Sequence, residues 1–127
     1  MAKNIEGRRV LIYGAGDGGE LVLRELLNNR GLKYSPVGFL DDDPAKSGKL
    51  IHGLKVYGGN GDLNSVCEQQ QVDEILISSS RMTDERLQEI LRLLPGAKYQ
   101  GEAHAYQHRG FDGHRQRGAV EILCLNN

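Results

Sequence analysis

Apolar runs alternate with stretches of helical periodicity over the first hundred residues of this chain. Strand-like runs fall at residues 8–13, 34–40, 53–58 and 72–78, and helical patterns fall at residues 18–29, 62–70 and 84–94. The fourth strand is apolar throughout its centre, Ile75-Leu76-Ile77, which is typical of a parallel strand covered on both faces. Strands that alternate with helices predict an α/β fold with a doubly wound parallel sheet.

The same pattern predicts the lateral order of the strands and the extent of the domain. We expect a single domain with strand order 3-2-1-4-5, in which the fifth strand lies near residues 97–100. Residues 101–118 contain three histidines, three arginines and four glycines with little apolar periodicity, and residues 119–125 regain a strand-like run. We therefore predict a folded domain at residues 1–100 and an irregular C-terminal extension, residues 101–127, with an edge strand.

The first predicted strand runs directly into a loop with the pattern Gly-x-Gly-x-x-Gly, formed by Gly14, Ala15, Gly16, Asp17, Gly18 and Gly19. Gly14 permits a tight turn, Gly16 lets a pyrophosphate approach the backbone, and Gly19 lets the next helix pack close to the sheet. The loop and the helix N-terminus offer backbone N–H groups to phosphates. The strand before the loop and the helix after it favour a Rossmann-like nucleotide-binding site over a glycine-rich turn.

The second predicted strand ends on three acids, and the first of them, Asp41, lies 22 residues after Gly19. An acid at this place in a dinucleotide-binding fold accepts hydrogen bonds from a ribose. Asp41 is the first candidate and Asp42 the second, and the alternative is a solvated acidic turn. A carboxylate there favours NAD(H) over NADP(H), because it repels a 2′-phosphate, although Lys46 and Lys49 are near in the sequence. Coenzyme A and UDP-sugars share the pyrophosphate and stay open as ligands.

Ser79, Ser80 and Arg81 follow the fourth strand, on the far side of the point where the strand order reverses. Ligands of open α/β sheets bind at that point, beyond the carboxyl ends of the strands. We predict that these three residues line the second half of the ligand site, where Arg81 can pair with a phosphate. The alternative is a polar loop whose hydroxyls cap the next helix.

Charge and composition exclude several other functions. The net charge is −1, and the chain has five Tyr, two Phe and no Trp, so neither a nucleic-acid nor an anionic-membrane partner is expected. No signal peptide and no long apolar run is present, which predicts a reducing, cytoplasmic setting. Cys67 lies on an apolar helical face with Leu63 and Val66, so we expect it to be buried.

A metal site is not expected. The two cysteines have no metal-binding or redox spacing. His104, His108 and Asp112 are four residues apart, as ligands on a helix are, but Gly110 and Gly113 argue against a helix there.

Four segments together carry a resemblance to a known family: residues 10–16, 38–44, 51–58 and 72–77. They resemble the Rossmann (CoA-binding-like) module of the capsular-polysaccharide nucleoside-diphosphate-sugar epimerase/dehydratase family, which is also fused to undecaprenyl-phosphate sugar-phosphate transferases. The resemblance implies that Gly14, Gly16, Gly19 and Asp41 contact a nucleotide and that the sugar chemistry resides in another domain. None of the five tyrosines has a lysine four residues later, as the acid/base pair of such enzymes requires, so no catalytic residue is predicted.

The sequence thus leads to one preferred hypothesis and two alternatives. The preferred one is a bacterial module that binds a NAD(H)-type dinucleotide and serves sugar-nucleotide or cell-surface polysaccharide biosynthesis, as a homodimer or fused to a catalytic domain. The first alternative is a NAD-dependent UDP-sugar dehydrogenase or epimerase that oligomerisation completes. The second is a dimerisation or docking domain without a ligand.

Overall fold

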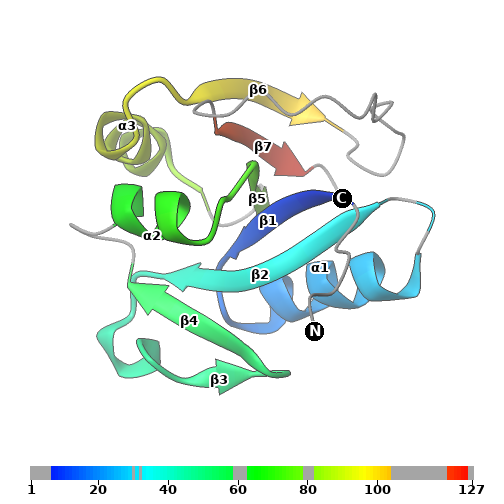
Figure 1. The fold of residues 1–127 in the computed structure, drawn as a ribbon. Coiled ribbons are helices and arrows are strands. Elements are labelled where there is room, and N and C mark those ends of the chain that lie inside the picture. The colour runs from blue at the N-terminus through cyan, green and yellow to red at the C-terminus, as the bar shows by residue number, and fades with distance from the viewer. Residues whose placement is uncertain are drawn as a thin grey trace.

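The structure is a computed structural model that describes residues 7–29, 31, 33–58, 63–78, 82–103 and 120–125. Its elements in chain order are β1 (Arg8–Tyr13), α1 (Asp17–Asn28), β2 (Tyr34–Asp41), the 3-10 helix η2 (Pro44–Lys46), β3 (Leu50–Ile51), β4 (Leu54–Gly58), α2 (Leu63–Gln69), β5 (Glu74–Ser78), α3 (Asp84–Leu93), β6 (Lys98–Ala103) and β7 (Glu121–Leu125) (Figure 1). The predicted α/β class and the alternation of strands and helices are confirmed. Within these described ranges, no helix is long and apolar enough to cross a bilayer.

The seven strands form one sheet in the order β3-β4-β2-β1-β5-β7-β6, and every neighbouring pair is parallel except β3 with β4. The predicted order of the first four strands is confirmed as β4-β2-β1-β5. The short strand β3 was not predicted. It pairs with β4 across a two-residue turn in which His52 (φ 51°) and Gly53 (φ 82°) both have positive φ, as a tight hairpin requires.

The C-terminal strand lies elsewhere than the sequence analysis placed it. It was expected at an edge, but β7 pairs with β5 on one side and β6 on the other, so β6 is the edge strand. The composition of the two strands explains this arrangement. Four of the five residues of β7 are apolar (Ile-Leu-Cys-Leu after Glu121), whereas β6 is largely polar and exposes Lys98 and Tyr99.

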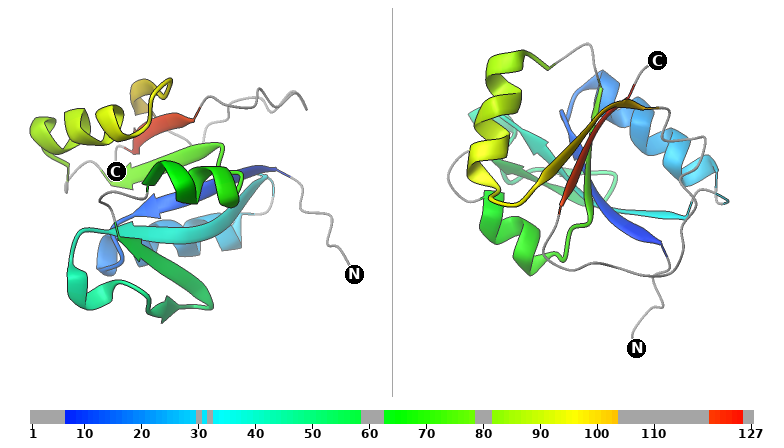
Figure 2. Two further views of the ribbon diagram at one scale, coloured as in Figure 1. Left: turned by 60° about the vertical axis from the view of Figure 1, so that its left-hand side comes forward. Right: turned by 90° about the horizontal axis from the view of Figure 1, so that it is seen from above.

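Helix α1 covers one face of the sheet, and α2 and α3 cover the other (Figure 2). The face toward α1 consists of residues such as Val10, Ile12 and Phe39, which pack against Val22, Leu23 and Leu26 of that helix. The opposite face, from Leu11 and Tyr13 to Ile122, packs against α2 and α3. Leu27, which follows Leu26 in α1, points away from this face and is 55% exposed.

The predicted burial of Cys67, on the same face of α2 as Leu63 and Val66, is confirmed. Burial raises the pKa of the Cys67 thiol to about 12, so the thiol is neutral at physiological pH. We expect Cys67 in a Cys124→Ser background to react with a thiol reagent at pH 8 only after the protein is unfolded. Absorbance-based thiol titration with and without denaturant measures this, and rapid labelling of the folded protein would contradict it.

An ion cluster ties the amino ends of three strands together, at the sheet edge opposite the glycine loop. Arg8 begins β1, Glu74 begins β5 and Glu121 begins β7. The Arg8 Nε lies 2.6 Å from Glu74 Oε2, and its Nη2 lies 3.2 Å from Glu121 Oε1. The Glu74 side chain is wholly buried, so the sheet carries a charged pair in its interior.

Candidate functional site

The structure brings most of the predicted site residues into one cleft at the carboxyl edge of the sheet. The loop after β1 lies beside the acids that end β2, and the Gly14 N–H donates to the Leu40 carbonyl at 2.6 Å. The cleft has a volume of about 310 Å³ and is lined by Tyr13, Gly14, Gly16, Gly18, Gly19, Asp41, Asp42, Asp43 and Lys46. The site therefore lies where ligands of open α/β sheets bind.

The geometry of the loop explains why glycine stands at the first and the last position of the Gly-x-Gly-x-x-Gly pattern. Gly14 has a φ of +98°, a conformation that side chains disfavour. A Cβ on Gly19 would lie 1.8 Å from the Gly14 carbonyl oxygen, so only glycine lets α1 start this close to the turn. The N-cap of α1 is Gly16, which offers no side chain to the helix N-terminus, and Asp17 is exposed outside the cleft. The first turn of α1 is therefore open to an anion.

Asp41 is held by the glycine loop rather than solvated. Its Oδ2 accepts a hydrogen bond from the Ala15 N–H at 2.7 Å, and its Oδ1 accepts one from the Asp43 N–H at 2.8 Å. The side chain is 15% exposed, and each carboxylate oxygen can accept a further hydrogen bond. The Ala15 N–H, which the sequence analysis offered to a phosphate, is thus used to orient Asp41. The ribose contact itself stays a prediction.

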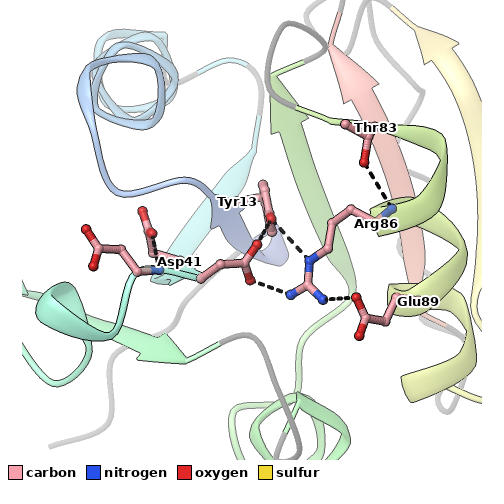
Figure 3. A network of polar contacts seen from close by, with 7 residues as sticks. Tyr13, Asp41, Thr83, Arg86 and Glu89 are labelled. Atoms are coloured by element: carbon pink, nitrogen blue, oxygen red, sulfur yellow. Dashed lines mark hydrogen bonds and ion pairs between the residues drawn. The ribbon is translucent and has the colours of Figure 1, made fainter.

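Asp42 takes part in a network that crosses from β1 to α3 (Figure 3). Tyr13 donates its hydroxyl proton to Asp42 Oδ2, and Arg86 Nη2 lies 2.5 Å from Asp42 Oδ1. Arg86 also donates to the Tyr13 hydroxyl oxygen at 3.3 Å and to Glu89 Oε1 at 2.8 Å. Thr83 caps the N-terminus of α3, because its Oγ1 accepts a hydrogen bond from the Arg86 N–H at 3.1 Å. Both oxygens of Asp42 therefore have protein partners, and the network joins α3 to the wall of the cleft.

Tyr13 and Arg86 keep the protonation states that their hydrogen bonds in this network need. Burial, and then the hydrogen bond to Asp42, raise the pKa of the Tyr13 hydroxyl, so this group stays a donor. Burial opposes the charge of Arg86, but its hydrogen bonds to Tyr13 and Glu89 and the nearby Asp42 carboxylate raise its pKa overall. Sequence reasoning missed this network, because Asp42 and Arg86 are 44 residues apart and no local pattern links them.

Several predicted residues lie outside the described ranges. Ser79, Ser80 and Arg81 follow the described end of β5, and His104, His108 and Asp112 precede β7. Their predicted places are therefore not addressed by the structure. Among the residues that it does describe, no three His, Cys, Asp or Glu side chains are grouped to hold a metal ion.

A second cavity, of about 380 Å³, lies at the opposite edge of the sheet. It is lined by α2 and by the segments around the amino ends of β5, β6 and β7, including Cys67, Asp73, Ala97 and Val120. It has neither a glycine loop nor an open helix N-terminus among its lining residues. The cleft beside the glycine loop is therefore the better candidate for a nucleotide site, although its volume is the smaller of the two.

Comparison with known sequences gives a family and two relatives. Residues 2–96 match the sequence profile of the family described as the CoA-binding domain. The probable polysaccharide biosynthesis protein EpsC of Bacillus subtilis (strain 168) is 35% identical over 86 residues, which are 68% of this chain and 14% of that protein. The capsular polysaccharide biosynthesis protein CapD of Staphylococcus aureus is 30% identical over 90 residues, which are 70% of this chain and 15% of that protein. The chain thus spans about one-seventh of the length of these relatives.

Comparison with solved structures gives similar folds. UDP-D-quinovosamine 4-dehydrogenase from Vibrio fischeri has a TM-score of 0.56 and 27% identity, and the match covers 69% of this chain and 70% of that one. RSP, a Rex-family repressor, has a TM-score of 0.61 and 13% identity over 94% of this chain and 54% of its own. At that identity the likeness to RSP shows the fold alone.

Proposed function

Since the chain belongs to the CoA-binding domain family, we propose that it is a nucleotide-binding module of bacterial cell-surface polysaccharide biosynthesis and that it binds a NAD(H)-type dinucleotide in the cytoplasm. The observation that carries this proposal is the cleft in which the Gly14 turn, the open N-terminus of α1 and the oriented Asp41 carboxylate meet. Each of these features has a partner on a nucleotide: the first two face a pyrophosphate and the third faces a ribose.

The acids of the cleft favour NAD(H) over ligands that carry a further phosphate on the ribose. Asp41 would repel the 2′-phosphate of NADP(H) and, by the same argument, the 3′-phosphate of coenzyme A. The family description nevertheless names coenzyme A, and a UDP-sugar presents a pyrophosphate and a ribose as well. The measured affinities for these ligands therefore decide among them.

We place the sugar chemistry outside this chain. Two polysaccharide biosynthesis proteins match it over only 14% and 15% of their length, which supports a binding module attached to, or acting beside, a catalytic domain. A second candidate function is an NAD-dependent UDP-sugar dehydrogenase or epimerase that oligomerisation completes. The likeness to UDP-D-quinovosamine 4-dehydrogenase at 27% identity favours it, and turnover of a UDP-hexose by the purified chain tests it.

Isothermal titration with NADH, NADPH, coenzyme A and UDP-glucose tests the proposed function. We expect NADH to bind more tightly than NADPH, and Asp41→Asn to narrow this difference, because the variant removes the charge that repels the extra phosphate. Glu25→Gln is the matched control, since it removes one carboxylate charge from an exposed position of α1 that does not line the cleft. Absence of binding by all four ligands at millimolar concentration would overturn the proposal and favour a dimerisation or docking domain.

A further inference from the structure

Lys46 reaches into the cleft from a short, well-held turn. It is the last residue of η2, whose N-cap Asp43 accepts a hydrogen bond from the Ala45 N–H at 3.0 Å and whose first residue is Pro44. The Lys46 Nζ lies 3.9 Å from Asp41 Oδ2 and 3.5 Å from the point where a Cβ on Gly16 would stand. The ammonium group therefore lies over the glycine at which a pyrophosphate approaches the backbone.

The charges around the cleft make this ammonium group important for an anionic ligand. Three carboxylates, those of Asp41, Asp42 and Asp43, line the cleft, and among the described lining residues Lys46 is the one cation. Arg86 is close by, but it pairs with Asp42 and Glu89 and is not part of the lining. Without a cation the acids would oppose the binding of a diphosphate.

The ion pair between Lys46 and Asp41 is suited to exchange. Its separation of 3.9 Å is long for an ion pair, and 37% of the Lys46 side chain is exposed to solvent. Such a pair is weak, so a phosphate that offers two charged oxygens competes with it readily.

We propose that Lys46 exchanges partners when a ligand binds: its ammonium group leaves Asp41 for the pyrophosphate over Gly16, and Asp41 is freed to accept the ribose hydroxyls. This inference rests on the proposed function and narrows the ligand class to nucleoside diphosphates and their esters. Lys46 is then a specificity-determining residue that contacts the diphosphate group, which NAD, coenzyme A and UDP-sugars share. A cation that instead contacted a phosphate on the ribose would raise the affinity for coenzyme A and NADPH only.

Titration of Lys46→Met with ADP, UDP, NADH, coenzyme A and adenosine tests the exchange. We expect affinity for the four diphosphates to fall about tenfold, since one charged hydrogen bond is lost. Adenosine has no phosphate, so we expect its binding, followed by NMR chemical shifts at millimolar concentration, to be unchanged. We also expect the affinity for ADP to decrease more steeply with salt concentration in the unmodified chain than in the variant. Lys49→Met is the matched control, because Lys49 is an exposed lysine three residues away that does not line the cleft.

The possible outcomes separate this inference from the function on which it rests. If the unmodified chain binds diphosphates and Lys46→Met binds them equally well, the nucleotide-binding function stands and the exchange is overturned. A loss confined to coenzyme A, or an equal loss for adenosine, also overturns it, because Lys46 would then read the ribose phosphate or only position Asp41. If the unmodified chain binds no nucleotide, both proposals fail. Equal melting temperatures of the two lysine variants confirm that a loss is not caused by unfolding.

Discussion

Replacement of Arg8 by methionine is expected to lower the free energy of unfolding by about 3–5 kcal/mol, the largest stability change that we predict for one side chain. Arg8 lies 2.6 Å from the wholly buried carboxylate of Glu74 and also pairs with Glu121. Methionine keeps the unbranched apolar stem of the side chain but removes the guanidinium and its positive charge, so the Glu74 carboxylate stays in the interior without its partner. Denaturant unfolding followed by circular dichroism measures the loss.

Two further variants test whether the loss of stability comes from the Arg8–Glu74 pair. Arg24→Met removes the same charge from an exposed position on α1, and we expect it to change stability by less than about 0.5 kcal/mol. Adding Glu74→Leu to Arg8→Met is expected to restore much of the lost stability, because an apolar side chain replaces the buried carboxylate. If Arg8→Met were as stable as Arg24→Met, the Arg8–Glu74 pair would contribute little to the fold.

Replacement of Gly19 by alanine is the second large effect, and it acts on both stability and binding. The new Cβ would lie 1.8 Å from the Gly14 carbonyl oxygen and 2.8 Å from the Gly14 carbonyl carbon, so the backbone itself has to move. We expect a loss of about 1–3 kcal/mol in the free energy of unfolding, as for other overpacked sites. We also expect the nucleotide binding proposed above to weaken about tenfold or more, because α1 no longer begins against the turn.

Gly31→Ala is the matched control for this substitution. Apart from its chain neighbours, a Cβ at Gly31 meets no atom of the described residues within 4 Å, and the φ of Gly31 lies outside the positive region that disfavours side chains. We expect Gly31→Ala to unfold and to bind as the unmodified chain does. Thermal unfolding and the same calorimetric titrations compare the two variants, and equal behaviour of Gly19→Ala and Gly31→Ala would show that the loop tolerates a side chain at Gly19.

Local sequence pattern was sufficient to predict the central part of the fold. Ile75-Leu76-Ile77 and Val10-Leu11-Ile12 are apolar at every position, because helices cover both faces of the sheet at these strands. The pattern could not place β7. Its position between β5 and β6 depends on which strand edges are free to pair once the sheet has formed, and that property belongs to no single segment.

The candidate site divides in the same way. The glycine loop and Asp41 could be identified because a phosphate-binding turn has strict backbone requirements that appear in the residue types themselves. Asp42 was the second candidate for the ribose, and its contacts with Tyr13 and Arg86 show that its carboxylate has partners other than those of Asp41. Lys46 was noted only as a neighbour in sequence, because nothing local shows that its ammonium group returns over Gly16.

The amino-acid order alone thus specified the helices, most of the strands, most of the side chains that they bury and the turn that requires glycine, since all of these follow from the spacing of side chains along one segment. The folded chain decided which acid is oriented by the loop, which one pairs with Arg86, where Lys46 lies and which strand closes the sheet. These outcomes depend on distances between residues that are far apart in the chain. Ion pairs and hydrogen bonds form only between groups that lie close together, and these groups come together only after the sheet and its helices have packed.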